Sequence, residues 1–160
     1  MKFTQQISIN APAEKVWDIL GRDFVNVGTW ATAVSHSEVN ASIPSVNNSP
    51  VGARTCTTSF GKASEEFTAY DDAKRTYSFK GVFESKMFTN VTSSAQVESV
   101  NESTSVTKLT PEVELTFLGK LMYPIIKMQL NKSIVQALED LKYYVENGKP
   151  SPAKLASQQK

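Results

Sequence analysis

The spacing of apolar side chains changes once along this 160-residue chain, and that change constrains the fold more than any other feature. From residue 3 to residue 117, apolar and polar side chains alternate within short segments, which is typical of strands with one buried face. From residue 118 to residue 145, apolar side chains recur every three or four positions, which predicts a helix with one apolar face. The chain therefore combines a set of strands with one long C-terminal helix.

Turn signals divide the first part of the chain into seven predicted strands and two short helices. The first strand covers residues 3–9, and Pro12 with Glu14 predicts the start of the short helices at 12–21 and 24–30. The other strands are predicted at residues 34–41, 53–60, 64–70, 75–82, 89–100 and 104–117. Short turns join most of these strands, which indicates an antiparallel meander.

The long helix is predicted to start at Leu118 and to stop at Asn147-Gly148. Pro124 lies near its start and either kinks the helix or sets its first turn. Residues 149–160 show no apolar period, so we expect a mobile or extended polar tail. The sequence thus predicts one α+β domain over residues 1–148, in which a seven-stranded curved antiparallel sheet wraps around the long helix.

Composition excludes several classes of function. Seventeen Lys and Arg against sixteen Asp and Glu give a net charge of +1, which argues against a nucleic-acid partner. No apolar run approaches the roughly 18–20 residues that span a bilayer, so we expect no stable membrane insertion, and we find no signal peptide. One cysteine, Cys56, and one histidine, His36, argue against a disulfide and a metal site. We expect no cofactor and a cytoplasmic location.

An internal cavity is the main functional expectation. A curved sheet that grips a helix leaves a gap wherever the facing side chains are small. Strand parity places Gly81, Ser93 and Ala95 on the inner face, where they leave volume unfilled. We therefore expect a cavity for a small hydrophobic or amphipathic molecule, such as a lipid, a polyketide or an aromatic compound.

Glu65 is the sharpest candidate for a functional residue. Parity turns it inward together with Phe67 and Ala69, and a carboxylate among aromatic rings has a raised pKa unless it is paired. Arg54 on the preceding strand is the predicted partner. Such a pair anchors the polar end of a ligand directly or through water, or it is a purely structural ion pair.

Further side chains are candidates for the cavity lining because of strand parity, loop position or helix spacing. They are Trp30, Phe67, Tyr77, Phe79, Lys86, Phe88, Val91, Ser93, Ile125, Gln129 and Ser133. The loop at 84–88 and the turn at 59–62 are expected at the mouth of the cavity. For each candidate the alternative is ordinary core packing or, in the loop, ordinary solvation.

Two segments carry a resemblance to a known family. ISINAPAEKVWDIL and VGARTCTTSFGKASEEFTAYDDAKRTYSF, with Trp30 between them, resemble the polyketide cyclase/dehydrase and lipid-transport superfamily, known as SRPBCC. The matching frame consists of Gly52, Arg54, Gly61, Glu65, Asp71, Arg75 and Tyr77. The resemblance covers roughly residues 1–148 and implies a START-like helix-grip fold, similar to that of the birch-pollen allergen.

The same resemblance bears on function. In the plant abscisic-acid receptors, which look similar here, positions corresponding to Arg54 and Glu65 belong to the polar part of the pocket. The chain lacks the gate and latch motifs of those receptors, so a hormone-receptor role is not supported. Superfamily members include cyclases, lipid carriers and proteins of unknown role, so fold alone does not fix the function.

Three functions follow from the sequence, in order of preference. The first is a carrier or sensor of a small apolar molecule. The second is a cyclase/dehydrase-type enzyme with Glu65 as its acid/base, helped by Arg54 or Tyr77. The third is a protein-interaction module, which predicts a large exposed apolar patch and a collapsed cavity. We expect a monomer or a homodimer.

Overall fold

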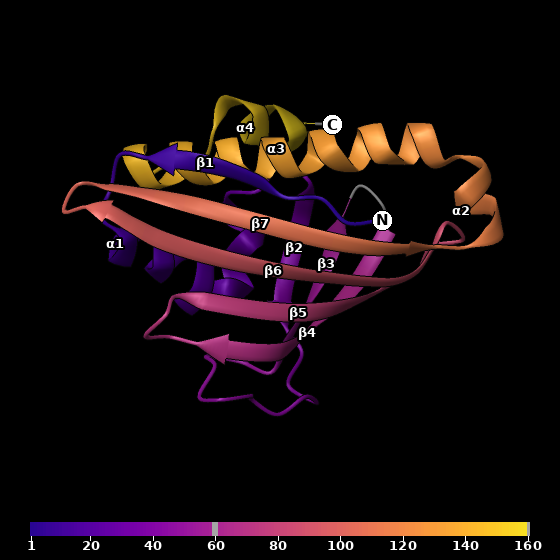
Figure 1. Ribbon diagram of the computed structural model, residues 1–160, viewed down its shortest axis with the longest axis horizontal. Helices are drawn as coiled ribbons and strands as arrows, with labels where there is room; N and C mark the ends of the chain where they lie inside the picture. The colour runs from indigo at the N-terminus through magenta and orange to yellow at the C-terminus, as the bar shows by residue number, and fades with distance from the viewer. Residues whose placement is uncertain (59–60, 160) are drawn as a thin grey trace.

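One seven-stranded antiparallel sheet dominates the structure, a computed structural model that describes residues 1–58 and 61–159 (Figure 1). The strands are β1 (Gln5–Ile9), β2 (Val34–Val39), β3 (Ala53–Thr58), β4 (Gly61–Asp71), β5 (Thr76–Phe83), β6 (Phe88–Asn101) and β7 (Thr104–Leu115). Their order is β1-β7-β6-β5-β4-β3-β2. Each strand from β2 to β7 therefore pairs with its neighbour in the chain, and β1 returns to pair with β7. The predicted curved antiparallel sheet is confirmed.

Three short helical segments connect β1 to β2 and cover part of the inner face of the sheet. They are α1 (Ala13–Trp17), the π-helical turn η1 (Asp18–Arg22) and the 3-10 segment η2 (Phe24–Thr29). Trp17 and Phe24 are buried, and their rings lie 5.6 Å from Tyr70 and 4.2 Å from Phe67 between centroids. These aromatic contacts hold the helical segments against β4.

The predicted long helix is interrupted once near its start. Helix α2 (Phe117–Leu121) is followed by α3 (Tyr123–Asn147), and Met122 between them has non-helical dihedral angles. Pro124 lies in the first turn of α3, so of the two expected roles it sets the first turn. Gly148 ends α3 in a left-handed conformation with φ of 68°.

The face of α3 that meets the rest of the protein carries Ile126, Leu138, Leu141 and Val145. The helix runs beside β1 (Figure 1), where two hydrogen bonds join them. Gln5 Nε2 donates to Asn131 Oδ1 at 2.7 Å, and Lys142 Nζ donates to the Ser8 carbonyl oxygen at 2.7 Å. The apolar stripe predicted from the spacing thus packs inward, and the curved sheet grips the helix.

The C-terminal segment differs from the expected mobile or extended tail. Residues Pro152–Ser157 form helix α4, which Ser151 caps by accepting a hydrogen bond from the Lys154 backbone nitrogen at 3.1 Å. Ser151 Oγ also donates to Asp140 Oδ1 of α3 at 2.5 Å, and Lys154 Nζ donates to the Val34 carbonyl oxygen at 2.6 Å. The prediction failed because buried polar contacts, rather than an apolar period, anchor this helix.

Strand parity fails at one place in β4 and at the end of β7. A register shift between Phe67 and Ala69 turns Ala69 outward and buries Tyr70. The last strand ends at Leu115, and Phe117, predicted as its final residue, begins α2. Gly61 and Lys62 of the predicted turn belong to β4, while residues 59–60 lie outside the described residues.

Candidate functional site

A mostly apolar pocket of about 190 Å³ lies between the inner face of the sheet, η2 and α3. Nine of the predicted site residues line it: Trp30, Arg54, Glu65, Tyr77, Phe79, Phe88, Val91, Ser93 and Ser133. They come from five strands or loops and one helix, so the meander brings together side chains that are distant in sequence. The site is therefore a product of sheet curvature rather than of a local motif.

The structure places four other predicted site residues outside this lining. Phe67 packs under Phe24, Lys86 is exposed in the loop between β5 and β6, and Ile125 and Gln129 face solvent on α3. The helix presents Leu130, Ser133, Ile134 and Ala137 to the pocket instead. Ile125 and Gln129 are four residues apart and share the adjacent, outer face, because the apolar stripe passes through Ile126.

Arg54 and Glu65 form a buried ion pair at the pocket wall. They are register partners across β3 and β4, and their exposed fractions are 7% and 8%. Arg54 Nε donates to Glu65 Oε2 at 2.6 Å, and Nη2 lies 2.6 Å from the same oxygen. The third guanidinium nitrogen, Nη1, donates to the Phe24 carbonyl oxygen, and the guanidinium carbon lies 3.7 Å from the centroid of the Phe24 ring.

The surroundings of the pair leave no uncompensated charge in the pocket. Burial is the largest single influence on the pKa of Arg54 and lowers it, but the combined influence of Glu65, Cys56 and Tyr77 raises the pKa above its ordinary value. Burial raises the pKa of the Tyr77 phenol, and it raises the pKa of the nearby Cys56 thiol to about 12. Tyr77 and Cys56 are therefore neutral at pH 7, and of the described residues that line the pocket only Arg54 and Glu65 are charged.

The guanidinium nitrogens of Arg54 have partners within the protein, but only one of the two carboxylate oxygens of Glu65 has one among the described residues. Each guanidinium nitrogen of Arg54 already has one partner within the protein, and the adjacent Glu65 carboxylate disfavours a second negative charge beside it. Both contacts to Glu65 use Oε2, and within residues 1–58 and 61–159 Oε1 receives no hydrogen bond. The site can therefore accept a hydrogen bond from a ligand more readily than it can bind a negative charge.

The sequence interpretation missed several lining residues at the helical side of the pocket. Those on α3 could have been found from the helical spacing of the apolar residues. Those in the short segment after Trp30 could not be found from the alternation of inward and outward side chains, which applies only within strands. The larger of these residues are Leu20, Val27, Val34, Leu130 and Ile134, and on the sheet side the lining also includes Phe3, Phe83, Leu109 and Val113. All of them are apolar, which strengthens the hydrophobic character of the site.

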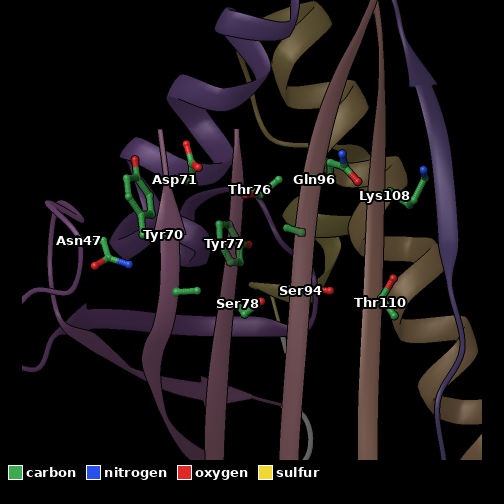
Figure 2. A pocket seen from close by; sticks show the side chains of 12 residues that line it. Asn47, Tyr70, Asp71, Thr76, Tyr77, Ser78, Ser94, Gln96, Lys108 and Thr110 are labelled. Carbon is green, nitrogen blue, oxygen red and sulfur yellow. The ribbon is translucent and has the colours of Figure 1, made fainter. Parts of the chain in front are cut away.

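A second hollow, of about 410 Å³, lies on the opposite side of the sheet (Figure 2). Ser78, Ser94 and Thr110 occupy paired positions across β5, β6 and β7 there, so their short side chains leave a shallow depression. The depression is open to solvent and carries polar side chains, among them Gln96 and Lys108. It lacks the enclosing apolar wall of the inner pocket.

Two further observations concern the described residues. No three His, Cys, Asp or Glu side chains gather there in a way that suits a metal ion. None of the helices within residues 1–58 and 61–159 has the length and the hydropathy to cross a membrane.

The sequence profile of the family described as "Polyketide cyclase / dehydrase and lipid transport" matches residues 1–146. The chain belongs to this family. The match covers the sheet, the pocket and nearly all of α3, so the family resemblance seen in the sequence is confirmed. No protein of curated function matches the chain by sequence.

Solved structures of this family's fold are similar over most of the chain. An uncharacterized protein from Bacillus thuringiensis has a TM-score of 0.74 and 16% identity, covering 92% of this chain and 100% of that protein. The Zhui aromatase/cyclase from Streptomyces has a TM-score of 0.77 and 10% identity, covering 91% and 93%. A START superfamily protein from Mycobacterium smegmatis has a TM-score of 0.60 and 14% identity, covering 88% and 98%. At such low identities the likeness extends to the fold.

Proposed function

We propose that this protein binds a small, mostly apolar, uncharged molecule in the inner pocket and acts as its carrier or sensor. The observation that carries the proposal is a pocket with apolar walls and one buried, charge-compensated polar pair, Arg54 and Glu65. Apolar walls favour an apolar ligand, and a few polar groups fix its orientation. Membership of a family whose description includes lipid transport supports the proposal.

The volume of the inner pocket limits the size of the ligand. An apolar cavity of about 150 Å³ accommodates benzene, so a pocket of about 190 Å³ fits one or two fused rings or a short branched hydrocarbon. A larger ligand has to open the pocket, and the loop between β5 and β6, which ends at Phe88, is the segment we expect to move.

The pair of Arg54 and Glu65 limits which functional groups the ligand can carry. Glu65 Oε1 is the acceptor left for a ligand hydroxyl or N–H, whereas Arg54 already binds Glu65 and the Phe24 carbonyl oxygen, and the Glu65 carboxylate disfavours a second anion. We therefore expect a phenol or an alcohol to bind more tightly than a carboxylate of the same size.

Fluorescence titration with 2-naphthol, naphthalene and 2-naphthoate tests this proposal. The wild type should bind 2-naphthol saturably and about tenfold more tightly than the other two probes. Phe79→Arg, which adds a bulky charge to the pocket wall, should abolish binding of every probe. The double variant Arg54→Met/Glu65→Met should keep binding but lose the preference for 2-naphthol. Tighter binding of 2-naphthoate than of 2-naphthol, or no saturable binding by the folded protein, contradicts the proposal.

A second candidate function is a cyclase/dehydrase-type reaction in the same pocket. The family description and the similarity to the fold of an aromatase/cyclase favour it, and Glu65 is the only carboxylate among the lining residues that the structure describes. Glu65 lies in direct contact with Arg54, and it is the residue that would act as the acid/base of this reaction. Incubation with a short poly-β-keto thioester, followed by absorbance of aromatic products, tests the reaction. Full turnover by Glu65→Gln would remove its support.

Two further proposals concern the location of the protein and its partners. A single, buried, free cysteine suits a reducing compartment, so we place the protein in the cytoplasm. We also expect no nucleic-acid partner, because the net charge is only +1.

A further inference from the structure

The corner where α2 meets α3 lies at one end of the molecule (Figure 1), and exposed apolar side chains form a patch on it. This corner patch consists of the exposed side chains Phe117, Leu118, Leu121, Tyr123, Ile125 and Met128. Phe117 is 87% exposed and Leu121 is 73% exposed, which is unusual for large apolar side chains grouped together. The inner pocket does not use any of these six residues.

The structure fixes the orientation of the patch. Thr116 caps α2 by accepting a hydrogen bond from the Gly119 nitrogen at 3.0 Å, and its hydroxyl donates to the Lys86 carbonyl oxygen at 2.8 Å. Gly119 is buried against the loop between β5 and β6, where a Cβ would collide with the Met87 carbonyl oxygen. Because the buried side of α2 is occupied by Gly119, the larger apolar residues of this helix face solvent.

The segment that carries the corner patch has positive charges only. Lys120, Lys127 and Lys132 are exposed within it, and no Asp or Glu occurs from residue 115 to residue 138. Lys86 lies in the adjoining loop. Nearby carboxylates lie in that loop and on β7: Glu84, Glu112, which pairs with Lys2 at 3.4 Å, and Glu114, which accepts from Asn90 at 2.7 Å. The patch therefore combines projecting apolar side chains with a local excess of lysine.

We propose that the corner patch docks this protein on an anionic lipid surface. Aromatic and aliphatic side chains flanked by lysines suit the boundary between headgroups and acyl chains, where lysines attract anionic lipids. Protein–protein interfaces are instead depleted in lysine and enriched in arginine, and this patch contains lysine without arginine. Next to the patch, Ile126 of α3 packs in one cluster with Phe88 and Val113. Phe88 and Val113 also line the inner pocket, so the patch lies close to one end of that pocket.

Co-sedimentation with vesicles tests the docking directly. The wild-type protein should bind vesicles of phosphatidylcholine with about 30 mol % phosphatidylserine at least about tenfold more tightly than pure phosphatidylcholine vesicles. Added salt should weaken this binding. The variant Lys120→Glu/Lys127→Glu/Lys132→Glu and the variant Phe117→Ser/Leu121→Ser should each lose about tenfold or more in affinity.

A charge-matched control separates the patch from net charge. The variant Lys15→Glu/Lys74→Glu/Lys149→Glu makes the same change in net charge at exposed positions, and it should bind like the wild type. These positions belong to α1, to the turn between β4 and β5 and to the segment after α3, which lie at the opposite end of the molecule from α2 (Figure 1). Equal binding to both kinds of vesicle, or equal losses in the two lysine variants, overturns the proposal. So does a dimer in sedimentation velocity that Phe117→Ser/Leu121→Ser dissociates, because the patch is then covered by a second copy. None of these results bears on whether the inner pocket binds 2-naphthol.

Discussion

Arg54 and Glu65 face each other across β3 and β4, with Arg54 Nε 2.6 Å from Glu65 Oε2 and both side chains nearly inaccessible to water. A buried pair of this kind has a specific energetic signature. Removing one partner leaves a buried charge without compensation, whereas replacing both by apolar groups costs little. The pair therefore specifies the chemistry of the pocket more than it stabilises the fold.

We expect Arg54→Met to lower the free energy of unfolding by about 3–5 kcal/mol, because Glu65 is then buried without its partner. The double variant Arg54→Met/Glu65→Met should lie within about 1–2 kcal/mol of the wild type. Urea unfolding of the two variants checks the contrast. A double variant less stable than Arg54→Met would show that the pair is a major source of stability.

Asp140 should be essential for holding α4 and the segment before β2. It is fully buried and accepts hydrogen bonds from the Thr32 nitrogen at 2.7 Å and from Ser151 Oγ at 2.5 Å. Asp140→Ala leaves these donors buried without partners, which should cost about 2–4 kcal/mol in urea unfolding. The exposed Glu139→Ala is the matched control on the same helix and should change stability by less than about 0.5 kcal/mol. Equal effects of the two substitutions would contradict this role.

Acid stability should depend on Asp72. Hydrogen bonds from Arg22 to its two carboxylate oxygens, at 2.9 Å each, are the main cause that holds the pKa of Asp72 below its ordinary value of 3.8. Trp17 Nε1 donates to the same group at 2.8 Å. Because the folded pKa is depressed, this stabilisation is present above about pH 4 and is lost as the pH falls below it.

Asp72→Asn should therefore reduce the dependence of the melting temperature on pH below about pH 4, and it should lower the melting temperature at neutral pH. Since Asp72 and Arg22 are partly exposed, added salt should weaken the effect. Thermal unfolding at several pH values measures both trends. Parallel pH profiles for the variant and the wild type would show that Asp72 does not contribute to acid sensitivity.

Cys56 should be unreactive in the folded protein. It is 1% exposed, and burial raises the pKa of its thiol to about 12, so thiolate is scarce at pH 8. We expect a disulfide reagent such as dithionitrobenzoate to react with Cys56 only at the rate of unfolding. Rapid reaction under native conditions, at the rate of a free thiol, would show that the wall formed by β3 opens readily.

Much of the fold could be predicted from the sequence because local patterns carry it. Alternation located the strands, and the pairing of Arg54 with Glu65 followed from inward parity on two adjacent strands. Parity failed at the register shift after Phe67, because a bulge leaves no reliable trace in the alternation of side chains. The apolar period of the last third of the chain likewise identified α3.

The features that could not be predicted depend on contacts between distant residues. Ile125 and Ile126 are equally apolar, and only the packing of α3 decides that Ile126 is buried and Ile125 is exposed. Helix α4 depends on Asp140 and on the Val34 carbonyl oxygen, neither of which is near residue 151 in sequence. The Ser151-Pro152 pair is a helix-start signal that was present in the sequence, although it lacked an apolar stripe.

The central claim, that the inner pocket holds a small apolar molecule, is tested most directly by comparing Ser93→Phe with Ser94→Phe in 2-naphthol titrations. The two serines are neighbours on β6, but Ser93 lines the inner pocket and Ser94 lines the outer hollow. Ser93→Phe should fill the pocket and weaken binding at least about tenfold, while Ser94→Phe should bind like the wild type. Equal binding by both folded variants, or a loss caused by Ser94→Phe alone, would contradict the account.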